Sequence, residues 1–245
     1  MNAESKFGQN EFLMCIQSID LDKYALDGIT KEADKNEKLY KINEDIFLIA
    51  GAVIEARDAE SGEHVFRVKE YTRLLANKIM ETFPEYGLSN ELISYITAAS
   101  ALHDLGKIMI PDSILLKAGK LTPEEFEIMK THTVKGCELI DRFPLESAEN
   151  YVNCAREICR WHHERYDGKG YPDGLSGEDI PISAQIVGIV DCYDALTTKR
   201  VYKDARTPDE AFEMIKNGEC GAFSDKILLC FEKVRDSFAS LAVHS

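Results

Sequence analysis

The sequence has little positive charge and no long apolar run, and each scarcity excludes a class of protein. It carries 29 Lys and Arg against 43 Asp and Glu, a formal net charge of −14. This balance argues against polymeric nucleic acid or an anionic membrane as the general partner. The longest wholly apolar run, residues 46–54, is too short for a bilayer-spanning helix, which needs ~20 residues. We therefore expect no membrane insertion and a cytoplasmic location.

The sequence also lacks paired cysteines of the Cys-x-x-Cys type, which begin many structural zinc sites. Its cysteine count is odd, which argues against a disulfide framework. We expect all of them to be reduced thiols with a structural role: Cys15, Cys137, Cys154, Cys159, Cys192, Cys220 and Cys230.

No stretch alternates polar and apolar residues as a half-buried strand does, whereas helical spacing recurs, so we predict an all-α fold. The stretches 122–125 and 207–210 both read Thr-Pro-acidic-Glu, which is typical of a helix start. From Glu37 the apolar positions recur at the spacing of one helical face: Tyr40, Ile42, Ile46, Ile49, Ala50 and Val53. The other predicted helices cover 62–82, 90–104, 146–163, 182–196 and 225–238, besides those beginning at 122 and 207. We divide the chain into a helical or linker segment, 1–44, and one main domain, 45–245.

Histidine is scarce, yet most of the histidines stand beside a carboxylate or beside each other. His103-Asp104 follows an apolar stretch, 93–102, and an ionised Asp there is costly unless it is paired or bound to metal. Asp191 follows the apolar run 186–190, and Asp194, one turn later, is positioned to support a ligand. The chain's remaining histidine, His244, lies in the tail, and we assign it no role.

The chain offers eight candidate metal ligands, which are too many for one ion. They instead fit two metals that share the Asp104 carboxylate, with room for a third. The absence of thiolates among these donors favours iron, manganese, zinc or nickel over a structural zinc knuckle. A chance gathering of polar core residues is the alternative that we disfavour. The predicted ligands are Glu60, His64, His103, Asp104, His132, His162, His163 and Asp191.

Five motifs in this order resemble those of the HD-GYP phosphodiesterases, a branch of the HD-domain metallohydrolases. The resemblance covers about residues 45–235, and its motifs are ESGEHVFRV (60–68), HDLGK (103–107), HTVKG (132–136), HHERYDGKGYP (162–172) and DCYDALTTKRVYK (191–203). It implies an HD-domain helical bundle with a GYP loop and extra C-terminal helices. It also implies hydrolysis of cyclic dinucleotides, chiefly cyclic di-GMP, to linear pGpG or GMP through a metal-bridged hydroxide.

The resemblance also implies a division of the ligands between two ions. One ion would be held by His64, His103, Asp104 and Asp191. The other would be held by Asp104, His132, His162 and His163. Glu60 matches a glutamate that helps bind a third ion in some members of the family.

Substrate contacts are predicted from basic and aromatic residues near these motifs. Lys107 is the best candidate for a phosphate contact and, with Asp104, for a catalytic role; Arg200 and Lys203 would hold the second phosphate. Tyr171 is positioned to stack on a base or, alternatively, to pack. The loop around it, 167–172, is no calcium loop, because Lys169, Tyr171 and Pro172 occupy positions that such a loop reserves for ligands and glycine.

Two other functions stay open at this point. Some HD-fold proteins are di-iron oxygenases, and a cyclic-dinucleotide sensor would bind without hydrolysis. The chain reads Phe223-Ser224-Asp225 where the family often has Phe-Asp-Pro, which puts only a local helix cap in doubt. A protein partner at the GYP loop and a homodimer are further expectations.

Overall fold

Every regular element within residues 32–57, 63–142, 149–198 and 205–243, the part of the chain that the computed structural model describes, is helical. The only departure there is an isolated bridge between Asp167 and Ser176. The predicted all-α class is confirmed. Within those ranges, no helix is long and apolar enough to cross a bilayer.

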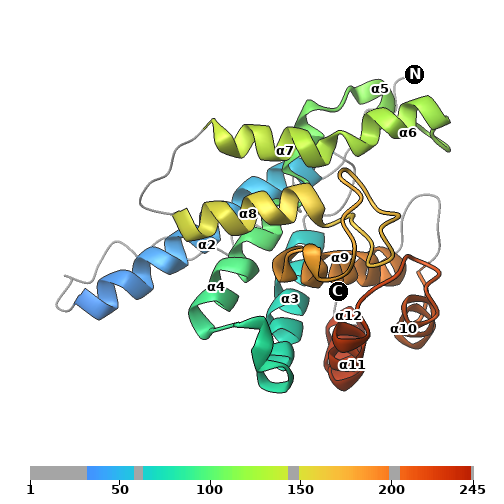
Figure 1. Ribbon diagram of the computed structural model, residues 1–245. Helices are drawn as coiled ribbons and strands as arrows, with labels where there is room; N and C mark the ends of the chain where they lie inside the picture. The colour runs from blue at the N-terminus through green and yellow to red at the C-terminus, as the bar shows by residue number, and fades with distance from the viewer. Residues whose placement is uncertain (1–31, 58–62, 143–148, 199–204, 244–245) are drawn as a thin grey trace.

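Helix α3 (Glu63–Thr82) lies in the centre of the bundle, against α4 (Asn90–Ala99), α9 (Ile182–Thr197) and α11 (Asp225–Lys233) (Figure 1). It buries Val68, Tyr71, Leu75 and Ile79, whose spacing of three or four residues forms one helical face. Burial of each such side chain contributes about 1.5–3 kcal/mol. The Tyr71 ring stacks on Phe238, which fixes α12 (Arg235–Val243) to α3.

Three predicted helices are interrupted. The helix that begins after Thr122 has the predicted capping box with Glu125. It ends at Lys130 as α6 (Pro123–Lys130), and a new helix, α7 (His132–Asp141), begins two residues later. The helix predicted over 90–104 ends as α4 at Ala99 and tightens into a 3₁₀ turn, η3 (Ser100–Leu102). The helix predicted over 225–238 is broken at Val234 between α11 and α12.

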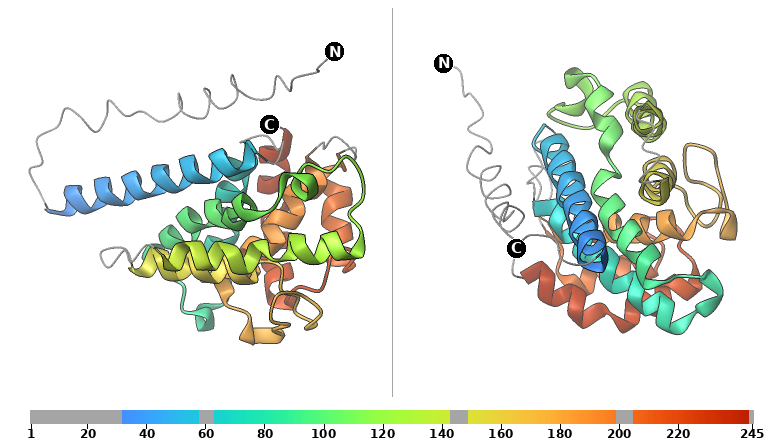
Figure 2. Two further views of the ribbon diagram at one scale, coloured as in Figure 1. Left: turned by 90° about the horizontal axis from the view of Figure 1, so that it is seen from above. Right: turned by 90° about the vertical axis from the view of Figure 1, so that its left-hand side faces the viewer.

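The remaining helices surround this core. Helix α7 lies along α8 (Glu149–Trp161), α10 (Pro208–Lys216) lies with α12 at one end, and α2 (Glu32–Glu55) runs along one side (Figures 1 and 2). The short elements are η2 (Pro84–Tyr86), η4 (Leu105–Met109), α5 (Asp112–Leu115) and η6 (Gly177–Asp179). Helix α2 crosses residue 44 without a break, and the division at 44/45 stays a prediction.

The face of α2 that packs on the bundle differs from the predicted one. Ile46 and Val53 are 53% and 46% exposed, whereas Leu48, Ala52 and Glu55 are buried. The prediction was wrong for Ile46 and Val53, whereas Ala50 packs against the core. The buried stripe is shifted by about half a turn and carries Gly51 and Glu55 as well as apolar residues. A pattern search for apolar side chains passes over both.

Candidate metal centre

The turn between η3 and η4 directs His103 and Asp104 into the interior. The His103 Nδ1–H donates to the carbonyl oxygen of Ser100 at 2.9 Å, because a carbonyl can only accept. The other ring nitrogen, Nε2, is therefore left facing the Asp104 carboxylate, 3.3 Å from Oδ2. Both side chains are buried, with His103 only 1% exposed.

His132 and His162 are oriented in the same way from two other helices. The His132 Nδ1–H donates to the Met129 carbonyl and the His162 Nδ1–H to the Ile158 carbonyl, both at 2.8 Å. Their Nε2 atoms lie 3.5 Å apart, and 3.2 and 3.9 Å from Asp104 Oδ1. The breaks before α7 and after α8 put these rings at helix ends, where they can turn toward one point. His132 is thus the first residue of α7 and does not lie inside a longer helix.

His163 completes this group through ring contacts. Its ring centroid lies 4.0 Å from that of His162 and 5.2 Å from that of His132. One donor atom from each of Asp104, His132, His162 and His163 lies within 4.8 Å of the others. We call these four residues the histidine-rich half of the site.

His64 and Asp191 face the other side of the turn that carries His103 and Asp104, which we call the HD turn. The His64 Nε2 lies 3.4 Å from the His103 Nε2 and 3.6 Å from Asp191 Oδ1. Asp191 Oδ1 is 3.8 Å from the His103 Nε2. All three residues therefore converge on one volume between α3, α9 and the HD turn.

Asp194, which was predicted to support a ligand, contacts His64. The His64 Nδ1–H donates to Asp194 Oδ2 at 2.7 Å, and the Arg67 guanidinium donates to the same carboxylate at 2.6 and 3.0 Å. Hydrogen bonds from His64 and Arg67, which outweigh burial, lower the pKa of Asp194 to about 2. This carboxylate–histidine pair is typical of metal sites, where it fixes the tautomer and the ring orientation.

Glu55, the last residue of α2, is a member of the site that sequence reasoning missed. Its side chain is 1% exposed, and a carboxylate oxygen lies within 4.8 Å of ring nitrogens of His64 and His103. We call Glu55, His64, His103 and Asp191 the carboxylate-rich half. The signal that could have found Glu55 is its register with Leu48 and Ala52 on one helical face.

A glycine allows the HD turn to meet α7. A Cβ built on Gly106 would lie 1.8 Å from the His132 carbonyl oxygen, so no side chain fits there. The backbones of η4 and α7 therefore touch, and this contact brings His132 to Asp104.

The two halves have opposite electrostatics. Burial lowers the pKa of His103, but Asp104 and then Asp191 and Glu55 raise it to about 10. Burial and the neighbouring His103 lower the pKa of His162 to about 3. Burial, His162 and His132 likewise hold the pKa of His163 well below its usual value.

Lys107, the candidate for a phosphate contact, lies beside Asp104. Its Nζ is 2.8 Å from Asp104 Oδ2, and its side chain is 14% exposed. Burial alone would raise the pKa of Asp104, but Lys107 and then His103 hold it well below its usual range. The Asp104 carboxylate is therefore ionised, the form in which a carboxylate binds metal.

Tyr171 covers the histidine-rich half from the GYP loop. Its backbone N–H donates to the His163 carbonyl at 3.2 Å, and its ring lies on the His163 ring with centroids 4.7 Å apart. Phe126 and Lys130 of α6 stand beside it; Lys130 Nζ is 5.6 Å from the Tyr171 ring centroid. Tyr171 therefore borders the site with an aromatic face and a cation close by.

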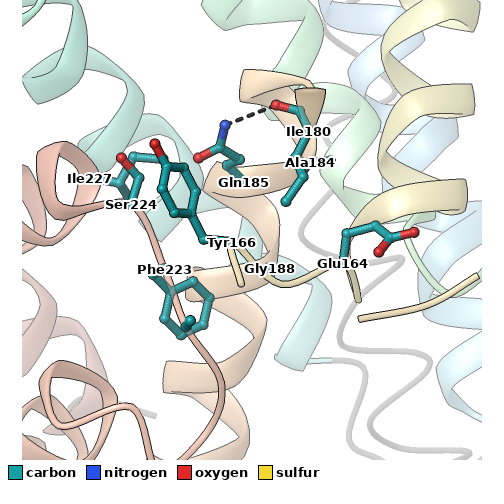
Figure 3. Close-up of a pocket in the computed structure, with 10 residues that line it drawn as sticks. Glu164, Tyr166, Ile180, Ala184, Gln185, Gly188, Phe223, Ser224 and Ile227 are labelled. Carbon is teal, nitrogen blue, oxygen red and sulfur yellow. Dashed lines mark hydrogen bonds between the residues drawn. The ribbon is translucent and has the colours of Figure 1, made fainter. Parts of the chain in front are cut away.

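Glu164 holds the rest of the GYP loop in place. Its Oε1 accepts hydrogen bonds from the backbone N–H groups of Asp173 and Gly174 at 2.7 and 3.0 Å. A cavity of about 10 Å³ lies under the loop, lined in part by Glu164, Tyr166, Gln185 and Ser224 (Figure 3). A space of this size holds about one water molecule, so it is no nucleotide site.

Three predicted site residues, Glu60, Arg200 and Lys203, lie outside the described residues. The remaining candidates, His64, His103, Asp104, Lys107, His132, His162, His163, Tyr171 and Asp191, are brought together by the fold. The donors suit divalent metals, because several imidazole Nε2 atoms and buried carboxylates converge. The Nδ1 atoms of His64, His103, His132 and His162 are already hydrogen-bonded to Asp194 or to backbone carbonyls, which leaves Nε2 as the ligand atom.

Comparisons with known proteins agree with this geometry. The family described as "HD domain" matches residues 60–220. By structure, the chain is similar to Bd1817, an HDG"Y"P protein from Bdellovibrio bacteriovorus, with a TM-score of 0.53 and 19% identity. That match covers 80% of this chain and 63% of the other, and it supports the helical HD-GYP fold.

Relatives with higher identity carry names of phosphodiesterases. A cyclic di-GMP phosphodiesterase of Vibrio cholerae is 38% identical over 217 residues, 87% of this chain and 44% of the relative. A cyclic di-GMP phosphodiesterase of Thermotoga maritima is 40% identical over 190 residues, 78% of this chain and 49% of the relative. A 3'3'-cGAMP-specific phosphodiesterase of Vibrio cholerae is 40% identical over 196 residues, 80% of this chain and 35% of the relative. The chain thus spans less than half the length of each of these relatives, and its similarity to HD-GYP phosphodiesterases is confirmed.

Proposed function

This chain belongs to the HD-domain family, and we propose that it hydrolyses cyclic dinucleotides, chiefly cyclic di-GMP, to linear pGpG or GMP. The observation that carries the proposal is the convergence of imidazole and carboxylate donors on both sides of Asp104. The names of the relatives, cyclic di-GMP and 3'3'-cGAMP phosphodiesterases, support the class of substrate.

Asp104 would be shared by two divalent ions in this proposal. His64, His103 and Asp191 would complete the first set of ligands, and His132, His162 and His163 the second. Iron or manganese is preferred, with zinc or nickel as alternatives, and Glu60 is proposed for a third ion. When bound, such metals would lower the pKa of a water molecule and neutralise charge on the phosphodiester.

The chain's own side chains orient the site and the substrate. Three backbone carbonyls and Asp194 hold the Nδ1–H groups of His64, His103, His132 and His162, which turns each Nε2 toward the cluster around Asp104. This preorganisation avoids reordering of the ligands when charge develops.

Positive charge for the substrate would come from Lys107, Arg200 and Lys203. The Lys107 ammonium, 2.8 Å from the Asp104 carboxylate, would contact the scissile phosphate as a catalytic residue. Arg200 and Lys203 would hold the second phosphate, and Tyr171 would stack on a base. A cation is needed here because the chain as a whole has a net charge of −14. A cytoplasmic location, a protein partner at the GYP loop and a homodimer stay predictions.

The test is hydrolysis by anaerobically purified, metal-replete protein. Cyclic di-GMP and 3'3'-cGAMP would be incubated with it, and linear products would be separated by chromatography, with Asp104→Ala as the control. We expect turnover that is lost in the control. Binding without turnover would instead indicate a sensor, and oxygen-dependent consumption of a non-phosphorylated substrate would indicate an oxygenase.

A further inference from the structure

Two contacts hold Glu55 beside the candidate metal centre, one from the backbone of α2 and one from the side chain of Arg57. A Cβ on Gly51 would lie 2.2 Å from the Ala101 carbonyl oxygen, so α2 and η3 touch at this glycine. Glu55 follows Gly51 by one helical turn, and His103 follows Ala101 by two residues. The close contact therefore determines which α2 side chain meets His103.

Arg57 ties the end of α2 to the segment after the HD turn. Its guanidinium donates to the carbonyl oxygens of Lys107, Ile108 and Ile110 at 2.7–2.9 Å, and to Asp112 at 2.6 Å. The Gly51 contact holds the chain before Glu55, and the Arg57 hydrogen bonds hold the chain after it. The Glu55 carboxylate therefore has a defined position beside the site.

The surroundings of Glu55 have the composition of a metal site. The Nδ1–H groups of His64 and His103 are engaged by Asp194 and Ser100, and their Nε2 atoms lie 3.4 Å apart. Both Nε2 atoms therefore point into the same cluster, where each can offer a lone pair to an ion. Asp191 adds a carboxylate oxygen 3.6 and 3.8 Å from the two nitrogens.

The distances also suit one ion. Metal–nitrogen and metal–oxygen bonds are each about 2.0–2.2 Å, so donors on opposite sides of an ion lie about 4.2 Å apart. The donor atoms of Glu55, His64 and His103 lie within 4.8 Å of one another, and need only a small contraction. A carboxylate that is 1% exposed also carries a large desolvation cost, which a divalent ion offsets.

We propose that Glu55 is a carboxylate ligand of the ion held by His64 and His103. This inference rests on the metal centre of the proposed function and adds a residue that the family motifs do not contain. The competing role is that of a plain charge partner for a protonated histidine, and metal binding distinguishes the two.

The experiment measures Mn²⁺ binding to metal-free protein by electron paramagnetic resonance, together with thermal unfolding with and without Mn²⁺. It compares the wild type with Glu55→Gln, Glu60→Gln and Glu63→Gln. Glu63 is the matched control, because it precedes His64 but its side chain is 53% exposed. For Glu55→Gln we expect about 10- to 100-fold weaker Mn²⁺ binding in one class of sites only. The rise in Tm on adding Mn²⁺ should shrink, while the metal-free Tm stays at or above that of the wild type.

Unchanged Mn²⁺ affinity in Glu55→Gln would overturn the inference, whether or not its metal-free Tm falls. If Glu55→Gln does not fold, Glu55→Asp decides: weaker Mn²⁺ binding by the folded variant supports the inference, and wild-type binding overturns it. A wild-type protein that binds Mn²⁺ but hydrolyses no cyclic dinucleotide would contradict the proposed function and leave the role of Glu55 standing. A wild-type protein that binds no Mn²⁺ would overturn both.

Discussion

The two halves of the site meet at Asp104 but differ in the balance of their donors. The carboxylate-rich half sets Glu55 and Asp191 against two imidazoles, whereas the histidine-rich half sets three imidazoles against Asp104 alone. The pKa of His103 is raised to about 10, and that of His162 is lowered to about 3. Burial acts alike on both rings, so the neighbouring charges produce the difference.

This contrast suggests that the two halves have different preferences for ions. Oxygen donors suit harder ions such as Mn²⁺, and imidazole suits Fe, Zn and Ni. Neutral imidazoles are also ready to bind metal at neutral pH without releasing a proton. The halves should therefore load and exchange metals separately, and variants that affect one half at a time can test this.

Asp104→Asn should have the largest effect, because it weakens both halves at once. We expect a loss of kcat/KM of about 1000-fold or more, equivalent to about 4 kcal/mol. Product formation and the metal content per chain, measured by mass spectrometry, would check it. A variant that keeps two metals and its activity would show that the halves do not depend on a shared carboxylate.

Gly106→Ala should act mainly on the histidine-rich half. The added methyl group would collide with the His132 carbonyl and separate η4 from α7. A displacement of about 1 Å at a reacting group can lower activity about 100-fold. Gly136→Ala is the graded control, since its Cβ would meet its nearest atom at 3.1 Å, and should lose less. Equal activities of the two variants would contradict the proposed contact.

Asp194→Asn should act on the carboxylate-rich half alone. Loss of the carboxylate behind a ligating histidine typically lowers metal affinity about 10- to 100-fold. Calorimetric Mn²⁺ titration would show one weakened class of sites and one unchanged class. Thr198→Val removes one donor to Asp194 but keeps the carboxylate, so it should bind Mn²⁺ more tightly than Asp194→Asn does. Weakening of both classes would argue against independent halves.

Tyr171→Ala should have the smallest effect, since Tyr171 borders only the histidine-rich half. Loss of one base-stacking contact of about 1.4 kcal/mol corresponds to about a tenfold rise in KM. Tyr171→Phe keeps the ring and should bind substrate nearly as well as the wild type. If Tyr171→Ala instead lowers kcat with KM unchanged, Tyr171 supports His163 and does not bind a base.

The sequence was sufficient for much of the histidine-rich half, because HDLGK, HTVKG and the paired histidines are local motifs with recognisable neighbours. The breaks that bring these residues together were not predicted. Helix α6 ends at Lys130, although His132 was predicted to lie inside the helix that begins at Thr122. The tertiary contact at Gly106 accompanies the new start at His132.

Glu55 shows where sequence reasoning fails. An apolar pattern identifies the buried face of a helix only if the buried residues are apolar, and here that face carries Gly51 and Glu55. Nine positions separate Glu55 from His64, so no short motif contains both. Only the packing of α2 on η3 reveals that they meet.

The most direct test of the account is anomalous diffraction from crystals of metal-replete protein, recorded at the absorption edge of the bound metal. The account predicts at least two peaks, one on each side of the Asp104 carboxylate, with the Glu55 carboxylate coordinated to the peak nearer His64. A single peak, or peaks away from Asp104, would contradict it.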